Sequence, residues 1–127
     1  MFTILIPTFN NFTYLKLCLD SIKKNSKFNH EIIVHINDGS DGTLEYIKSN
    51  KINYTHSKKN IGLCSSLNLA SKQSSMKYLL YSHDDMYFCP RWDVYLSEEL
   101  NNTNDDFFYF SGTMIEPFKG AHLTYDC

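Results

Sequence analysis

The sequence predicts an α/β fold, in which a mainly parallel sheet of short strands is covered by helices on both faces. Short apolar runs alternate along the chain with segments of helical periodicity. This alternation implies right-handed crossovers, which place helices on both faces of a parallel sheet. A length of 127 residues with 43% hydrophobic residues suits one domain with its own core. We therefore expect a Rossmann-like, three-layer α/β/α sandwich that forms a single domain over residues 1–127.

Apolar runs, helical stripes and turn residues define the individual elements. The predicted strands cover residues 2–6, 31–36, 52–56, 78–82 and 107–110, and the predicted helices cover 12–24, 43–49, 63–72 and a segment that begins near Pro90.

The first strand and helix follow from patterning at the start of the chain. Residues 2–6 form an apolar run that we expect to stop at Pro7, as a buried strand would. Residues 12–24 then place four apolar side chains on one helical stripe, with Asn10, Asn11 or Thr13 available as the N-cap.

The middle of the chain repeats this order. Residues 31–36 are apolar and β-branched, and the Asn-, Asp- and Gly-rich residues 37–42 end that run before a short helix. Residues 52–56 alternate like a half-exposed strand, and the loop 57–62 precedes the helix at 63–72.

The last elements are a strand at 78–82, a helix and an aromatic run. Pro90 stands where a helix would begin. Phe107–Phe110 is an uninterrupted aromatic run, which we interpret as a strand covered on both faces. The side chains that we expect in the core here are Tyr78, Tyr81, Phe107, Phe108 and Phe110. The tail at 112–127 fits either a last β-hairpin or a loop.

Composition and charge exclude several classes of protein. A net charge of −2 gives no general attraction to nucleic acid or to anionic membranes. No apolar run approaches the roughly 20 residues of a membrane-spanning helix, and the N-terminus has no signal-peptide pattern. The four cysteines contain no CxxC pair, which argues against a zinc site or a disulfide framework. We expect a cytoplasmic protein without a nucleic-acid partner.

The polar residues gather in the loops that follow the predicted strands. These loops, at 7–10, 37–42, 57–62 and 83–87, would meet at one edge of the sheet, where open α/β sheets bind ligands. The opposite loops carry only ordinary solvated side chains. The sequence has no GxGxxG, no GxxxxGK[ST] and no GxSxG motif, so a dinucleotide fingerprint, a P-loop and a nucleophile elbow are excluded.

Four segments in this order resemble the family 2 glycosyltransferases of GT-A fold. They are Ile4–Asn10 (ILIPTFN), Asn37–Thr43 (NDGSDGT), Asn60–Leu63 (NIGL) and Ser82–Met86 (SHDDM) with Pro90 and Trp92 after it. The resemblance covers about residues 2 to 112, and it implies a truncated GT-A domain. It also implies a nucleotide-sugar ligand, with a UDP-sugar as the leading candidate, and a divalent metal on the diphosphate.

The resemblance implies a role for each matching residue. Thr8 and Phe9 would flank the base, Asp38 would bind the uracil edge, Asn60 and Gly62 would close over the nucleotide, and Asp84 and Asp85 would face the ribose and the metal. Pro7 and Asn10 complete the nucleotide-binding set. Asp38, Asp84 and Asp85 are also residues that turns and helix starts favour for local reasons.

The chemistry of these residues supports a metal independently. A diphosphate binds poorly to a domain of charge −2 unless a cation intervenes, and Mg²⁺ or Mn²⁺ takes carboxylate and phosphate oxygens. Adjacent side chains on an extended segment point in opposite directions, so we expect one carboxylate of the pair, Asp85, to touch the metal. His83 stands where a strict D-x-D motif would have an acid.

The catalytic residue is not identified by the sequence. Glu116, His122 and Asp126 are the late candidates for a base, and none aligns with the base of the inverting enzymes. The alternatives to a transferase are a nucleotide-binding module or fragment without an acceptor site, and a structural domain with relic motifs. Because longer family members cover part of this sheet, we also expect a homodimer that buries exposed apolar surface.

Overall fold

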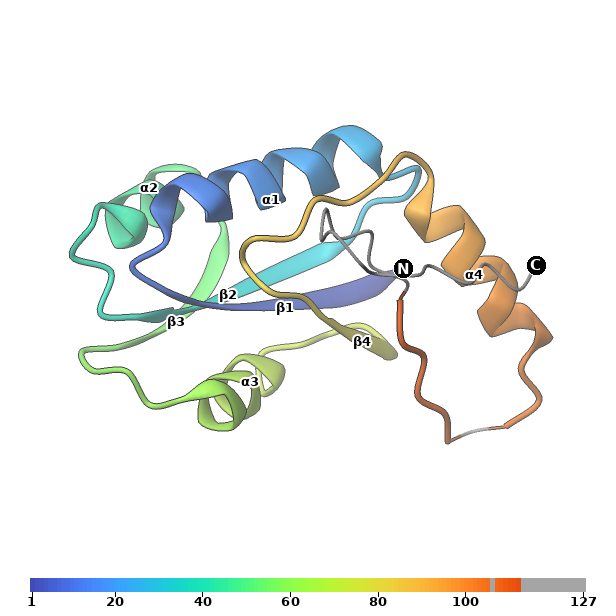
Figure 1. Ribbon diagram of the computed structural model, residues 1–127. Helices are drawn as coiled ribbons and strands as arrows, with labels where there is room; N and C mark the ends of the chain where they lie inside the picture. Colours follow the sequence, from blue (N-terminus) through green and yellow to red (C-terminus); the bar gives the residue numbers. More distant parts are fainter. Residues whose placement is uncertain (106, 113–127) are drawn as a thin grey trace, which may run out of the picture.

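A computed structural model describes residues 1–105 and 107–112 of the chain, in which a four-stranded parallel sheet carries helices on both faces (Figure 1). The strands are β1 (Phe2–Phe9), β2 (Glu31–Asn37), β3 (Asn53–Ser57) and β4 (Tyr78–Tyr81), and the helices are α1 (Phe12–Asn25), α2 (Thr43–Ser49), α3 (Leu63–Ser71) and α4 (Trp92–Asn102). The strand order is β3-β2-β1-β4. Helices α1 and α2 lie over one face and α3 over the other (Figure 1). The predicted α/β class is confirmed.

The core follows from the alternation of side chains along the strands. Phe2, Ile4 and Ile6 of β1 point to the layer of α1, where they belong to the larger buried cluster. Leu5 points the other way and packs with Ala70 of α3. Both faces of β1 are therefore buried, as expected of a central strand in a parallel sheet.

Strand β1 continues through Pro7 to Phe9, which corrects the end predicted for it. The carbonyl of Leu5 accepts a hydrogen bond from the Ser82 amide at 3.0 Å, so the backbone polar groups of Leu5 face the side of β4. Because backbone groups alternate in direction along a strand, those of Pro7, two residues later, face the same side. The pairing of β1 with β4 ends at the Leu5–Tyr81 pair. The missing N–H of Pro7 therefore interrupts no ladder, and β1 keeps its pairing with β2.

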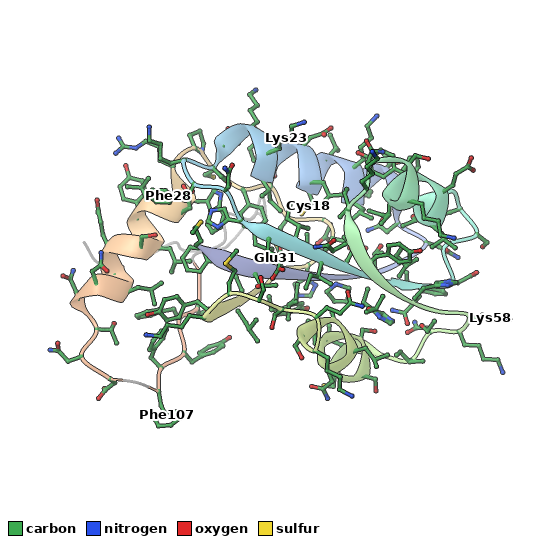
Figure 2. The ribbon with its side chains drawn as sticks, turned by 180° about the vertical axis from the view of Figure 1, so that it is seen from behind. Cys18, Lys23, Phe28, Glu31, Lys58 and Phe107 are labelled. Carbon is green, nitrogen blue, oxygen red and sulfur yellow. The ribbon has the colours of Figure 1, made fainter. Side chains whose placement is uncertain are left out.

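The predicted strand at 107–110 is wrong. These residues form no strand, and the side chains of Phe107 and Tyr109 are 95% and 89% exposed. Figure 2 shows the Phe107 side chain pointing away from the sheet. Phe108 is 39% exposed, and its ring lies 5.9 Å from that of Tyr78 and 5.0 Å from that of Phe110. Aromatic composition favours a strand only where a partner strand and a covering layer exist. Tyr81, also expected in the core, is 40% exposed.

Helix α4 is fixed to the sheet edge opposite the polar loops. The buried carboxylate of Asp93 accepts hydrogen bonds from the amides of Lys27 and Phe28 and lies 3.0 Å from Nε2 of His30. The Trp92 ring packs against His30, with ring centroids 5.0 Å apart. These contacts connect α4 to the turn between α1 and β2.

No helix within residues 1–105 and 107–112 is long and apolar enough to span a membrane. The predicted hairpin or loop near the end of the chain, with Glu116, His122 and Asp126, lies outside the described residues.

Candidate functional site

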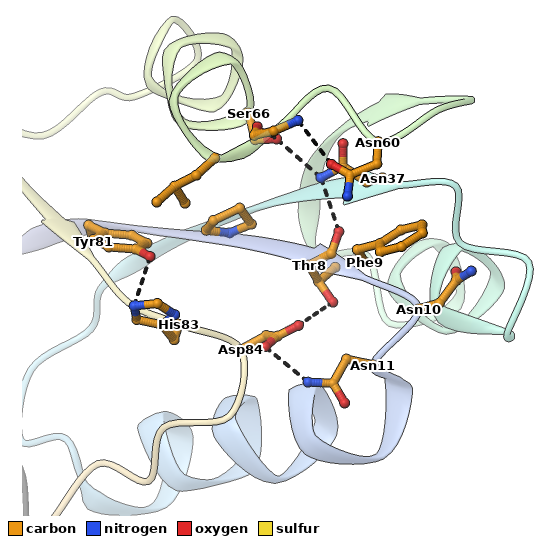
Figure 3. Close-up of a pocket in the computed structure, with 13 residues that line it drawn as sticks. Thr8, Phe9, Asn10, Asn11, Asn37, Asn60, Ser66, Tyr81, His83 and Asp84 are labelled. Atoms are coloured by element: carbon orange, nitrogen blue, oxygen red, sulfur yellow. Dashed lines mark hydrogen bonds between the residues drawn. The ribbon is translucent and has the colours of Figure 1, made fainter.

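A cavity of about 480 Å³ opens at the carboxyl edge of the sheet, between the ends of β1 and β4 (Figure 3). The strand order reverses here, because β2 lies on one side of β1 and β4 on the other. Such a switch point is where open α/β sheets bind ligands. The residues that line the pocket are Pro7, Thr8, Phe9, Asn10, Asn11, Asn37, Asn60, Gly62, Leu63, Ser66, Tyr81, His83 and Asp84.

Asp84 lines the pocket and is held by two partners, Thr8 near the end of β1 and Asn11 just before α1. Its carboxylate accepts a hydrogen bond from the Thr8 hydroxyl at 2.6 Å and another from the Asn11 amide at 3.0 Å (Figure 3). Asn11 stands at the N-cap position of α1, yet its side chain bonds Asp84 instead of the helix. The end of β4 is thereby joined to the end of β1.

Asn10 connects the pocket to the loop that follows β2. Its amide donates to the Asp38 carboxylate at 3.0 Å, and its side-chain oxygen accepts from the Gly39 amide at 3.0 Å. A Cβ at Gly39 would lie 2.7 Å from the Ile36 side chain, and φ there is +82°, so this tight turn requires glycine. Asp38 itself is held at the rim and does not line the pocket.

Asp41 connects the loop before α1 with the loop before α2 through hydrogen bonds. Its carboxylate accepts from the amide of Phe12, the first residue of α1, at 2.9 Å, and from the amide of Thr43, the first residue of α2, at 3.1 Å. Burial alone would raise the pKa of Asp41, but the hydrogen bonds from Thr43 and Phe12 outweigh it and the pKa is lowered. One ionised side chain therefore serves the N-termini of two helices.

Asn37 connects three walls of the pocket. Its amide donates to the Thr8 carbonyl at 3.2 Å and to the Ser66 hydroxyl of α3 at 3.1 Å (Figure 3). Its side-chain oxygen accepts from the Ile61 amide at 2.9 Å and from the Ser57 hydroxyl at 3.1 Å. All four hydrogen-bonding positions of the amide are filled.

The wall formed by α3 begins at Asn60 and Gly62. The Asn60 side chain accepts from the Gly62 amide at 2.9 Å, and the Ser66 hydroxyl donates to the Gly62 carbonyl at 2.6 Å. Lys58, at the tip of the preceding loop, points outward (Figure 2), and it does not line the pocket.

The wall formed by β4 carries Tyr81 and His83. The Tyr81 hydroxyl lies 3.0 Å from Nε2 of His83 (Figure 3). The buried Cys18 thiol donates a hydrogen bond to the His83 carbonyl, with 3.7 Å between sulfur and oxygen. Burial, assisted by the charges of Asp84 and Asp85, raises the pKa of Cys18 to about 12, so this thiol is not a nucleophile at neutral pH.

The chain offers oxygen donors for a metal, but it forms no complete cage. Asp85 is exposed and lies outside the pocket lining, next to Asp84. Among the residues that the structure describes, no three His, Cys, Asp or Glu side chains form a metal cluster. One or two carboxylates without a cage suit Mg²⁺ or Mn²⁺, which take their remaining ligands from phosphates and water.

The structure brings most of the predicted site residues together. Pro7, Thr8, Phe9, Asn10, Asn60, Gly62 and Asp84 all line the pocket, whereas Asp38 and Asp85 stand beside it. The sequence reasoning missed Asn11, Asn37, Leu63, Ser66, Tyr81 and His83 as pocket residues. Asn37 and Ser66 had a usable signal, since both are polar residues in segments that precede or begin predicted helices.

The family model described as glycosyl transferase family 2 matches residues 3–120 of the chain. An uncharacterized glycosyltransferase of Rickettsia felis is 32% identical over 129 residues, which cover 97% of this chain and 21% of that protein. Another from Rickettsia bellii is 36% identical over 110 residues, which cover 80% of this chain and 16% of that protein. The chain thus spans about a fifth of the length of the first relative and about a sixth of the second.

Solved structures share the fold. S. aureus TarS 1-349 in complex with UDP superposes with a TM-score of 0.70 at 23% identity, covering 80% of this chain and 32% of that one. The mannosyltransferase PcManGT from Pyrobaculum calidifontis, in complex with GDP-Man and Mn²⁺, superposes with a TM-score of 0.69 at 18% identity. The superposition covers 83% of this chain and 32% of that one. At these identities the likeness establishes the architecture of the sheet and its helices.

Proposed function

The chain belongs to glycosyl transferase family 2, and we propose that its pocket binds the nucleotide part of a nucleotide sugar, with a UDP-sugar as the donor. The observation that carries this proposal is the composition of the pocket, in which amides, hydroxyls and one carboxylate converge at the switch point of the sheet. A cavity of about 480 Å³ suits a small polar ligand. Two superposable structures were solved with UDP and with GDP-Man, which supports a nucleotide sugar as the class of ligand.

The base is proposed to lie on the side of the pocket formed by the first loop. Phe9 is 52% exposed at the pocket wall, so its ring is available to pack against a flat base. Thr8 and Asn10 complete that side, and Asp38 lies at the rim within reach of Asn10. Asn60 and Gly62 close the opposite side.

A divalent cation, Mn²⁺ or Mg²⁺, is proposed to connect the diphosphate to the end of β4. The carboxylate of Asp85 would hold it, and Asp84, fixed by Thr8 and Asn11, would face the ribose. When bound, the cation would neutralise the diphosphate and stabilise the departing UDP as a Lewis acid. The chain supplies the carboxylates and their orientation.

Transfer of the sugar to an acceptor is a separate proposal. It needs a general base within hydrogen-bond reach of the acceptor hydroxyl. Mass spectrometry of a UDP-sugar and acceptor mixture tests it, and we expect weak transfer or slow donor hydrolysis from this chain alone. Robust transfer would contradict that expectation. A chain that binds UDP without turnover would be a nucleotide-binding module.

Titration calorimetry with UDP tests the proposed binding. We expect binding in the presence of Mn²⁺ and its loss when EDTA is added, because the domain carries a net charge of −2. Asp85→Asn should weaken binding without unfolding the domain. Glu98→Gln, which removes one exposed negative charge from α4, is the matched control and should bind like the wild type. UDP affinity that is unchanged by EDTA would refute the metal assignment.

A further inference from the structure

A line of hydrogen bonds runs from the interior of the sheet to the pocket. The buried imidazole of His35, on β2, lies 2.7 Å from the Thr55 hydroxyl through Nδ1 and 3.2 Å from the Ser57 hydroxyl through Nε2. Ser57 in turn lies 3.1 Å from the side-chain oxygen of Asn37, which lines the pocket. His35 itself is not among the lining residues.

The donors and acceptors along this line agree with one arrangement of protons. The single hydroxyl hydrogen of Ser57 is shared between two acceptors, the side-chain oxygen of Asn37 at 3.1 Å and the Lys59 carbonyl at 2.8 Å. The Ser57 oxygen therefore accepts from Nε2–H of His35. Nδ1 then carries a lone pair and accepts from the Thr55 hydroxyl. Both ring nitrogens of a neutral imidazole are thereby satisfied.

The surroundings of His35 favour this neutral form. Burial lowers the pKa of His35, and the neighbouring His56 acts in the same direction, against a smaller opposing effect of Asn37. The imidazole is therefore uncharged at neutral pH, with one ring nitrogen as a donor and the other as an acceptor. A hydrophobic residue in this position would pack in the sheet, but it would leave Ser57 without its donor.

Asn37, at the pocket end of this line of hydrogen bonds, holds together the segments that form the pocket. Asn37 holds the Thr8 carbonyl at the end of β1, the Ile61 amide in the loop before α3, and the Ser66 hydroxyl on α3. A shift or rotation of the Asn37 amide would break several of these bonds together. The width of the pocket between β1 and the residues Asn60–Gly62 thus depends on the Asn37 amide.

We infer that His35 is a positioning residue for the pocket, which acts through Ser57 and Asn37 to hold the loop before α3 at the distance that the nucleotide requires. The inference rests on the proposed function for its ligand. It assigns a role to a buried residue that touches no ligand. The Thr55 side of the ring anchors the imidazole, whereas the Ser57 side transmits its position to the pocket.

Two substitutions on either side of the ring separate positioning from stability. Ser57→Ala cuts the link to the pocket, and Thr55→Val removes a hydrogen bond to the same imidazole on the far side. We expect Ser57→Ala to raise the Kd for UDP with Mn²⁺ roughly five- to tenfold, the effect of one hydrogen bond, and Thr55→Val to change it less than about twofold. Thermal unfolding is measured for both variants, and we expect similar decreases in Tm.

Substitution of His35 itself tests the donor at Nε2. Gln can present an amide N–H near the position of Nε2, whereas Leu has no donor. We expect His35→Leu to weaken UDP binding like Ser57→Ala, and His35→Gln to restore at least half of the lost affinity on a logarithmic scale. Equal affinity of Ser57→Ala, Thr55→Val and the wild type would overturn the inference, as would losses that follow Tm alone.

A second measurement keeps the two proposals distinguishable. Hydrogen exchange of the Ile61 amide reports the contact with Asn37 without any ligand. We expect exchange to quicken about fivefold or more in Ser57→Ala and to stay near the wild-type rate in Thr55→Val. Wild-type protein that binds neither UDP nor GDP would refute the proposed function, whereas unchanged Ile61 exchange in Ser57→Ala would refute the positioning role of His35.

Discussion

At the scale of single residues, Asp38 is proposed to set the base preference. Uracil presents an N3–H donor where cytosine has a lone pair, so a carboxylate near that edge favours uracil. If the bound base buries the Asp38 carboxylate, a polar group left unpaired costs about 1–3 kcal/mol, which predicts a preference for UDP over CDP of about five- to 150-fold. The measurement is a binding series of UDP, dTDP, GDP, CDP and ADP with the wild type and with Asp38→Ala. Equal wild-type affinity for UDP and CDP would refute the role.

Asp93 gives a prediction about pH and stability. Burial alone would raise its pKa, but hydrogen bonds from Phe28, Lys27 and His30 outweigh burial and the pKa lies below the ordinary 3.8. Because the folded pKa is depressed, the carboxylate stabilises the fold above pH 3.8, and this contribution is lost as the pH falls through the folded pKa. Asp93→Asn should lower the free energy of unfolding by about 2–4 kcal/mol at pH 7.

Urea unfolding of the wild type and Asp93→Asn at pH 7 and below pH 3.8 checks this prediction. The difference between them should shrink at the lower pH, where the wild-type carboxylate becomes protonated. Asp20→Asn, an exposed change on α1, should stay within about 0.5 kcal/mol of the wild type at both pH values. A difference for Asp93→Asn that is independent of pH would contradict the argument.

Site residues in motifs could be predicted from the sequence, whereas residues that act by long-range contact could not. Thr8 lies near the end of β1, Asn60 and Asp84 lie in the loops after β3 and β4, and all three line the pocket. Asn37 has the same turn chemistry as its neighbour Asp38, and only the fold decides which of the two side chains faces the cavity. A one-residue difference along an extended chain reverses the direction of the side chain.

At the scale of elements, Asp41 connects the starts of two helices. Asp41→Ala removes its hydrogen bonds to the Phe12 and Thr43 amides, and each lost cap costs about 1 kcal/mol. We expect a loss of about 1–2 kcal/mol in the free energy of unfolding, measured by circular dichroism during urea titration. Asp41→Asn keeps an acceptor oxygen and should lose less. An equal loss in both variants would indicate that charge, and not hydrogen bonding, is what matters.

Eight elements of the fold were predictable, and the ends of some were not. Local patterning identifies these elements because a helix buries one apolar stripe and a central strand of a parallel sheet buries both of its faces. The end of β1 depends on where β4 stops pairing, because only then does the missing N–H of Pro7 become harmless. The aromatic run at 107–110 has strand composition, yet a strand also needs a partner edge, which local sequence does not specify.

At the scale of the whole molecule, the most exposed aromatic side chains lie in the segment after α4. Phe107 and Tyr109 are almost fully exposed, and Leu79 and Tyr81 of β4 are about half exposed. Within residues 1–105 and 107–112, no strand pairs with the outer edge of β4. Open strand edges and exposed aromatic groups are both surfaces through which proteins associate.

We therefore predict that the chain self-associates, with a twofold dimer as the expected form. Sedimentation velocity should show a sedimentation coefficient that increases with concentration in the micromolar range. Phe107→Glu combined with Tyr109→Glu should abolish this increase without loss of stability, because neither side chain is buried. Tyr14→Glu, at an exposed aromatic position on α1, is the matched control and should associate like the wild type. A wild-type chain that stays monomeric at high micromolar concentration would refute the prediction, and a dimer unaffected by the double substitution would place the interface elsewhere.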